Sequence, residues 1–285
     1  MPRSFFLRMA LLAGLLFLYL PIFSLIVYSF NESRLASIWG GFSVRWYGEL
    51  LRNEQLLSAA WLSLRIAVAT ATGAVVLGTM AGLVLARFGP FRGRALFTGM
   101  ISAPLVMPEV IMGLSMLLLF VSLEQIIGWP NGRGATTIIL AHITFTASFV
   151  AVVVQSRLVS LDASLEEAAM DLGARPVKVF FVITLPIVAP AILSGWLLAF
   201  TLSLDDLVIT SFVSGPGSTT LPMVVFSSVR LGISPQINAL ATIVVTIVAI
   251  GIVIAGILNA RQERIRKRDE RMAEQAADAA AARIR

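Results

Sequence analysis

Long runs of hydrophobic residues, separated by short polar stretches, make up most of the chain. A helix needs about 20 apolar residues to cross the hydrocarbon core of a bilayer. Six runs reach that length, and they cover residues 10–30, 66–86, 95–123, 135–154, 190–213 and 237–258. The third run is interrupted by Pro104, Pro108 and Glu109, and the fifth contains Asp205 and Asp206. The pattern predicts an all-α polytopic membrane protein with six transmembrane helices.

The composition supports the same class of protein. Hydrophobic residues make up 58% of the 285 residues and charged residues 13%, whereas soluble domains have about 45–50% and about 25%. A soluble globule of this size has too small an interior to bury so much apolar surface. The chain has no cysteine and a single histidine, His142, which excludes disulfides and argues against a metal site. We expect His142 to be hydrogen-bonded within the helix bundle.

The positions of the basic residues predict the orientation of the chain. Most of the 22 Lys and Arg residues lie before the first run, between the second and third, between the fourth and fifth, and after the last. Cytoplasmic segments carry such an excess, so both termini are expected in the cytoplasm. We assign residues 1–260 to a transmembrane domain in the lipid bilayer and residues 261–285 to a basic, helical cytoplasmic tail. Because topology explains the net charge of +6, no nucleic-acid partner is expected.

The polar stretch between the fourth and fifth runs, about residues 155–182, is longer than a connection between two membrane helices requires. Ser164 and Glu167 have the spacing of a capping box, which predicts the start of a short helix. Gly173 tolerates the left-handed conformation that ends a helix, and Pro176 suits the first turn of a second helix. The sequence therefore predicts two short helices, joined by a tight turn, that project into the cytoplasm.

This projection carries apolar side chains that a lone subunit would expose to water: Met170, Leu172 and Val177. Exposed apolar side chains on a projecting helix indicate a docking surface for a partner protein. The chain itself has no P-loop, because neither Lys178 nor Lys267 follows a glycine as G-x-x-x-x-G-K-[ST] requires. Energy for transport would therefore come from a partner protein or from an ion gradient.

The same stretch carries a motif of defined spacing. Glu167-Ala168-Ala169 is followed after three residues by Gly173, and after nine more by Ile183-Thr-Leu185-Pro186. This pattern resembles the EAA motif of ABC importer permeases at each of its fixed positions. Other segments resemble the putrescine/spermidine subgroup, most closely the second permease subunit of a putrescine importer: Trp46-Tyr47, Ala103-Pro-Leu-Val-Met-Pro108-Glu109, Leu202-Ser-Leu-Asp-Asp206 and Ser214-Gly-Pro-Gly217.

The resemblance implies a type I ABC importer permease (MetI-like) fold in the bacterial inner membrane. In that family two similar permease subunits form the translocation pathway, and a periplasmic substrate-binding protein delivers the substrate. The EAA loops contact two ATP-binding subunits. The substrate implied here is a polyamine, either putrescine or spermidine. ATP and Mg²⁺ would be bound by the ATPase subunits, so we expect no cofactor in this chain and no enzymatic activity.

The resemblance also assigns the residues of a coupling loop that meets the ATPase: Glu167, Ala168, Ala169, Met170, Asp171, Leu172, Gly173 and Pro186. Glu167 is expected to cap and orient the first short helix. Met170 and Leu172 would make apolar contacts, with Asp171 at their rim. Pro186 would permit a bend where the loop joins the fifth run.

Three carboxylates lie within the predicted membrane runs: Glu109, Asp205 and Asp206. Charges there cost about 2.5–3.5 kcal/mol on an insertion scale and mark functional sites. Glu109 and Asp205 reach similar depths, about 21 and about 22 Å from the cytoplasmic ends of their runs. We hypothesise that the three carboxylates line a route for a cation, with Trp196 and Phe200 as an aromatic wall. Alternatively, the two aspartates pair with an arginine of the partner permease or cap a broken helix end.

Other functions stay open at this point. An ABC permease for another solute, such as an amino acid or ferric ion, would share the EAA motif. A secondary cation-coupled carrier would also place carboxylates in its spans, but it usually contains internal repeats, which the two halves of this chain lack. A non-transporting membrane scaffold would need no carboxylates in its spans. Of these classes, only an ABC importer subunit should co-purify with an ATP-binding protein.

Overall fold

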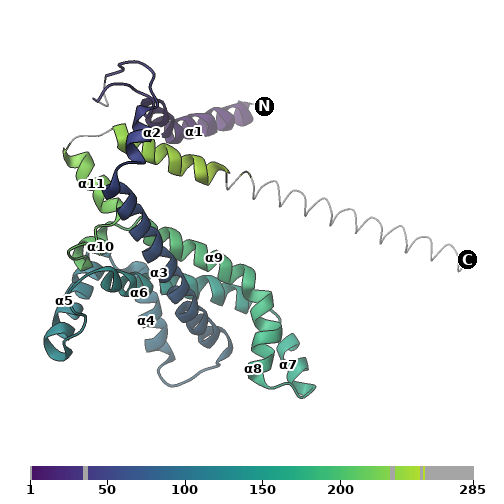
Figure 1. Ribbon diagram of the computed structural model, residues 1–285. Helices are drawn as coiled ribbons and strands as arrows, with labels where there is room; N and C mark the ends of the chain where they lie inside the picture. Colours follow the sequence, from purple (N-terminus) through teal and green to yellow (C-terminus); the bar gives the residue numbers. More distant parts are fainter. Residues whose placement is uncertain (1, 35–37, 232–234, 251–252, 254–285) are drawn as a thin grey trace, which may run out of the picture. The chain divides into compact units, whose positions relative to one another are not determined.

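The protein is built from α-helices, and we describe it from a computed structural model (Figure 1). The structure describes residues 2–34, 38–231, 235–250 and 253. Within these ranges the secondary structure is helical, apart from one isolated bridge between Asn31 and Phe42. Internal contacts divide the chain into two compact units: a larger unit of residues 53–230 and a smaller unit that joins the residues before 53 to those after 230.

The helices are distributed unevenly between the two units. The larger unit contains α3 (Glu54–Arg87), α4 (Arg94–Val106), α5 (Glu109–Ile127), α6 (Ala135–Val159), α7 (Ser164–Asp171), α8 (Pro176–Val179), the π-helix η1 (Phe180–Thr184), α9 (Leu185–Leu204), α10 (Val208–Val213) and α11 (Leu221–Leu231). The smaller unit contains α1 (Pro2–Tyr28), α2 (Arg45–Leu50) and a helix over Pro235–Ile250.

The lengths of these helices confirm the predicted all-α polytopic class. Five helical segments in the described part of the chain are long and apolar enough to cross a membrane: Phe5–Tyr28, Glu54–Arg87, Glu109–Ile127, Ala135–Val159 and Pro176–Leu204. The helix Pro235–Ile250 covers the beginning of the sixth predicted run. Most of the rest of that run, and the predicted tail 261–285, lie outside the described residues.

α6 is the central helix of the larger unit. It packs against both α3 and α9, and Figure 1 shows the three helices together. Side chains from these three helices form one apolar cluster: Ala71, Ala74, Val150, Val154, Leu158, Val188 and Ala199. A second cluster joins α3 and α6 to α5 and α10: Ile66, Met112, Phe120, Ile138, Ala141, Phe145, Ile209 and Val213. The α3–α6 pair is therefore the support on which the other helices rest.

The contact between α3 and α6 is close because α3 presents small residues to its partner. A Cβ atom added at Gly78 would lie 2.6 Å from the Val150 Cβ and 2.8 Å from the Ala147 carbonyl oxygen. One added at Gly82 would lie 2.9 Å from the Ala151 carbonyl oxygen. These two glycines form a GxxxG spacing, which lets helix backbones approach closely in a membrane. The structure thus identifies α6 as the helix that the small residues of α3 meet.

The third predicted run is divided into two helices. α4 ends at Val106, and α5 begins at Glu109 with Pro108 as its N-cap residue. Pro108 has no backbone N–H, and its ring favours the extended conformation that Met107 adopts at the end of α4. The break therefore lies at Pro108, and Glu109 stands in the first turn of α5.

The fifth predicted run is divided as well. α9 ends at Leu204, and the short α10 begins at Val208. The helix also begins before the apolar run does. Helical structure continues without a break over Pro176–Leu204, and the predicted orientation of the chain places its beginning on the cytoplasmic side. The helix thus connects the projecting loop directly to the break.

The smaller unit is held together around Asn31. The indole Nε1 of Trp46 in α2 donates to the Asn31 carbonyl oxygen at 2.6 Å. Gln236 donates from Nε2 to Glu49 Oε2 at 3.2 Å, which ties the helix Pro235–Ile250 to α2. The hydrogen bond from Arg45 lowers the pKa of the Glu49 carboxyl below its ordinary value, so this acceptor keeps its charge to a lower pH than a free glutamate.

The close α3–α6 contact predicts the effect of adding a single methyl group. Gly78→Ala places a Cβ where Val150 and the Ala147 carbonyl already lie, so we expect it to destabilise the protein by about 1–3 kcal/mol, the usual cost of overpacking. The matched control is Gly99→Ala in α4, where nothing lies within 4 Å of the new Cβ and alanine favours the helix. Thermal melting of the purified protein in detergent compares the two. Equal melting temperatures would contradict the packing described here.

Candidate functional site

The two short helices predicted for the coupling loop, about residues 155–182, are present. α7 ends at Asp171, and Gly173 follows in the left-handed conformation with φ +85°. α8 begins with Pro176 in its first turn. Figure 1 shows α7 and α8 projecting together from one end of the larger unit. Gly173 thus ends the first helix and Pro176 begins the second, as the sequence predicted.

The start of α7 differs from the predicted capping box. Ser164 is already inside the helix, and Asp162 accepts the Ser164 N–H at 3.0 Å through Oδ1. Hydrogen bonds from Ser164 lower the pKa of the Asp162 carboxyl below its ordinary value. The expectation that Glu167 caps the helix was therefore wrong. Asp162 stands two residues before Ser164, so its side chain accepts the Ser164 N–H in a local turn, and Glu167 is left exposed.

The turn between α7 and α8 presents apolar side chains to solvent. Leu172 is 91% exposed, and Met170 and Val177 are exposed with it, as the sequence predicted. Beside them lies a shallow hollow of about 480 Å³, lined by Ala169, Leu172, Gly173, Ala174, Arg175 and Lys178. Asp171 is exposed at the edge of this surface. Exposed apolar side chains next to a hollow lined by the basic residues Arg175 and Lys178 form a surface suited to binding another protein.

The junction between the coupling loop and the fifth run contains a π-helix. Residues Phe180–Thr184 adopt this wider turn immediately before Pro186. Proline removes one backbone donor, and its ring crowds the carbonyl one turn earlier. A π-helical turn provides the extra room. Helical structure therefore continues through Pro186 from α8 into α9, and the bend expected at Pro186 stays a prediction.

An ion pair that sequence reasoning missed joins the coupling loop to α3. Arg87, the last residue of α3, contacts Glu166 of α7. The two residues stand 79 positions apart, and no local pattern links charges at that separation. The motif directs attention to Glu167, whereas its neighbour Glu166 makes the contact. The only sequence signal was an arginine at the end of a membrane run.

The three carboxylates of the predicted route differ in their exposure. Glu109 and Asp205 are exposed, the first in the first turn of α5 and the second directly after α9. Gly113 of α5, four residues after Glu109, lies close to Ile209 of α10, four residues after Asp205: a Cβ added at Gly113 would be 3.3 Å from the Ile209 Cα. The two exposed carboxylates therefore stand in the same part of the larger unit. The third, Asp206, has a side chain only 5% exposed.

Asp206 caps the start of α10. Its Oδ2 accepts the Thr210 N–H at 2.7 Å and the Thr210 hydroxyl at 2.8 Å, and its Oδ1 accepts the Ile209 N–H at 3.3 Å. The same Oδ2 lies 3.1 Å from His142 Nε2. His142 Nδ1 in turn lies 2.8 Å from Ser203 Oγ. This geometry is that of the alternative in which an aspartate caps a broken helix end, and it confirms that His142 is hydrogen-bonded within the bundle.

The two aromatic residues expected beside the carboxylates lie together on α9. Trp196 and Phe200 are stacked, with ring centroids 5.3 Å apart and planes 10° apart. Trp196 donates from Nε1 to Thr72 Oγ1 of α3 at 3.3 Å. Both side chains are half-buried against the α3–α6–α9 cluster. Their place as an aromatic wall for a cation stays a prediction.

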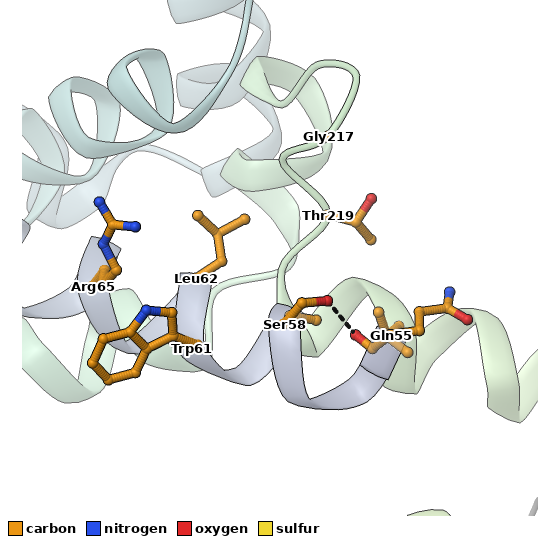
Figure 2. Close-up of a pocket in the computed structure, with 9 residues that line it drawn as sticks. Gln55, Ser58, Trp61, Leu62, Arg65, Gly217 and Thr219 are labelled. Carbon is orange, nitrogen blue, oxygen red and sulfur yellow. Dashed lines mark hydrogen bonds between the residues drawn. The ribbon is translucent and has the colours of Figure 1, made fainter. Parts of the chain in front are cut away.

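A pocket of about 360 Å³, lined by apolar and polar side chains, lies at the N-terminal end of α3. Figure 2 shows Arg65 and Trp61 on the α3 side of this pocket and Thr219 on the loop side. The Leu221 N–H donates to Ser63 Oγ at 2.8 Å and so holds the two sides together. A guanidinium among hydroxyl groups suits an anionic group better than a polyamine. We therefore do not assign this pocket to the cation route.

Comparison with known proteins adds relatives of similar length. The chain matches the model of the family described as binding-protein-dependent transport system inner membrane component over residues 74–268. It is 64% identical to the putrescine transport system permease protein PotI of Escherichia coli (strain K12), over 91% of this chain and 92% of that protein. It is 42% identical to the spermidine/putrescine transport system permease protein PotC of the same strain, over 87% and 90% of the two chains.

Solved structures share the fold. A chain of a bacterial ABC transporter involved in the import of the acidic polysaccharide alginate superposes with a TM-score of 0.67 at 18% identity, covering 90% of this chain and 96% of that one. A chain of the MetNI methionine ABC transporter gives a TM-score of 0.57 at 18% identity, covering 70% and 92%. These structures confirm the predicted MetI-like fold. The family match and the relatives confirm a transport subunit rather than an enzyme. The chain belongs to the family of binding-protein-dependent transport system inner membrane components.

Proposed function

We propose that the protein is a permease subunit of a polyamine importer, with putrescine as its main substrate. The observation that carries this proposal is the 64% identity, over 91% of the chain, to a protein named as a putrescine transport permease. The 42% identity to a spermidine/putrescine permease supports polyamines as the substrate class. Similarity at these levels extends over nearly the whole chain, which favours a shared substrate class and not only a shared fold.

In this proposal the protein works in the inner membrane with a second, similar permease, two ATP-binding subunits and a periplasmic substrate-binding protein. ATP and Mg²⁺ are bound by the ATP-binding subunits. The exposed Leu172 and Met170, beside the hollow at the α7–α8 turn, support an ATPase contact through the coupling loop. Both termini lie in the cytoplasm, on the same side as this loop, as the basic residues indicate.

The coupling loop acts on the pathway through one continuous helix. The segment Pro176–Leu204 runs without interruption from the loop to the break before α10. A displacement that the ATPase imposes on the loop and that reaches α8 is therefore carried along this helix to Asp205 and the capped start of α10. Alternating access follows when this displacement opens the break first toward one side of the membrane and then toward the other.

We place the cation route at the break between α9 and α10. Asp205 is exposed at this break and Glu109 is exposed in the first turn of α5, which packs against α10, so they supply two carboxylates for the two ammonium groups of putrescine. Trp196 and Phe200 provide apolar and aromatic surface for the methylene groups between them. Asp206 is occupied by its hydrogen bonds to α10 and acts on the route by holding the break in place.

Uptake by a bacterial strain that lacks its own polyamine permeases tests the substrate. Cells that express the protein with its partner subunits should accumulate labelled putrescine, whereas cells with an empty vector should not. Unlabelled putrescine should compete more strongly than spermidine, because the relative with the higher identity is named for putrescine alone. Uptake of an amino acid or of ferric ion without uptake of putrescine would contradict the polyamine assignment.

Leu172→Glu tests the docking surface. Leu172 buries almost nothing in its own chain, so folding should be unaffected. A charge in an apolar contact should weaken binding of the ATP-binding subunit by about tenfold or more, as expected for a hot-spot residue. The control is Phe88→Glu, the same kind of change at an exposed residue directly after α3. Co-purification and equilibrium binding measure both variants, and full ATPase binding by Leu172→Glu would refute this contact.

Neutral variants separate the route carboxylates from the cap. Glu109→Gln and Asp205→Asn should each raise the KM for putrescine by about tenfold, because each removes a charge-assisted hydrogen bond of about 1.5–3 kcal/mol. Their melting temperatures should not change. Asp206→Ala should instead lower stability by about 0.5–2 kcal/mol through the lost cap. If both neutral variants transport with wild-type KM, the carboxylates do not line the route.

A further inference from the structure

The coupling helix α7 needs a stiff connection to the membrane-spanning helices if it is to move them. α7 is eight residues long and has no buried residue, so apolar packing does not hold it in place. Gly173 follows it in a left-handed turn. If α7 were attached only by turns, a partner protein that pushed on it would move α7 without moving the neighbouring helices. The connection must therefore come from specific polar contacts.

Arg87 and Glu166 provide such a contact in the larger unit. Arg87 Nε lies 2.9 Å from Glu166 Oε2, and Arg87 Nη2 donates to Glu166 Oε1 at 3.4 Å. A guanidinium that meets a carboxylate at two points fixes the angle between the groups as well as their distance. The two side chains are only 18% and 13% exposed, so solvent screens this pair much less than a surface ion pair. The end of α3 and the first turn of α7 are thereby joined.

Two further hydrogen bonds extend the connection to other elements. Thr184 Oγ1 donates to Glu166 Oε1 at 2.8 Å. Thr184 is buried and is the last residue of the π-helix that leads into α9. Arg87 Nη2 also donates to the Leu161 carbonyl at 3.4 Å, just after α6. The Glu166 carboxylate therefore accepts hydrogen bonds from the end of α3 and from the π-helix that precedes α9 at the same time.

The two adjacent glutamates of α7 face different surroundings. Successive residues of an α-helix point about 100° apart, so only one of the pair can face the membrane helices. Glu166 does so, and Glu167 is exposed together with Met170 and Leu172. α7 therefore has one side directed at a partner protein and one residue directed at its own transmembrane helices.

We propose that Arg87, Glu166 and Thr184 form a clamp that makes α7, the end of α3 and the start of α9 move as one body. This inference rests on the proposed function, in which the ATPase drives transport through the coupling loop. The three residues are positioning residues, because they touch neither the substrate nor ATP. With the clamp intact, a displacement of α7 is transmitted to two membrane-spanning helices at once. Without it, α7 follows the ATPase while the pathway stays still.

The experiment uses the complete transporter, reconstituted in proteoliposomes, and measures putrescine transported per ATP hydrolysed. Glu166→Gln keeps the shape of the side chain and an acceptor for Thr184 but loses the charge that holds Arg87. Binding of the ATPase and ATP hydrolysis should persist, while the transport ratio falls by about three- to thirtyfold. Arg92→Met, which removes an exposed arginine from the segment between α3 and α4, is the control and should keep the wild-type ratio.

Two more variants distinguish a clamp from a general need for stability. Arg87→Lys keeps the charge but loses the two-point contact, so its ratio should lie between those of the wild type and Glu166→Gln. Arg87→Met combined with Glu166→Gln should be no worse than the poorer single variant, because both break the same link. If the residues only stabilised the fold, transport and hydrolysis would fall in parallel with the melting temperature, and the ratio would not change.

A covalent replacement gives the strongest test. The chain has no cysteine, so Arg87→Cys with Glu166→Cys allows a reducible bifunctional thiol reagent to join α3 to α7. Cross-linking should restore the transport ratio of this double variant, and reduction should remove the gain. A restored ratio supports the clamp. An unchanged ratio in Glu166→Gln, or no recovery on cross-linking, would overturn it, whereas a wild-type complex that does not transport putrescine would refute the proposed function instead.

Discussion

Apolar helices in lipid are not driven together by water, so their association depends on close van der Waals packing. In this protein the closest packing is between α3 and α6, where Gly78 and Gly82 admit the backbone and side chains of α6. α9 reaches the other side of α6 through Gly195, at which an added Cβ would lie 3.1 Å from Val150. Val150 thus packs against glycines of both α3 and α9, which also contact each other directly.

This three-helix arrangement determines where the functional segments lie. Because α3 and α9 both pack on α6, the end of α3 stands beside the start of the fifth run, and Arg87 and Thr184 meet on one carboxylate. At the other end of α9, the buried His142 of α6 lies against Ser203 and Asp206. Contacts from α6 and α3 therefore hold both ends of the helix that links the coupling loop to the break.

Polar side chains within the apolar part of the structure form hydrogen bonds with backbone groups that a helix leaves without a partner. A broken helix leaves N–H groups that have no water to bond to in a membrane, and these must be satisfied by protein. Asp206 meets this need for α10, while Thr210 and His142 satisfy the carboxylate in return. Asp205, next to it in the chain, has no part in that network and is left exposed. Two adjacent aspartates thus have different roles because one of them is used to end and restart a helix.

Much of this protein follows from the sequence alone. The membrane runs, the two helices of the coupling loop, the turn at Gly173 and the exposure of Leu172 are local properties, since they depend on hydropathy and on residues within a few positions of each other. The EAA spacing was likewise sufficient to indicate the family. Only the tertiary structure decided which helix meets Gly78, which glutamate of α7 pairs with Arg87, and which aspartate lies against the buried His142. The partners in those contacts stand 60 to 80 positions apart in the chain, and no periodicity or cap rule reaches across such a distance.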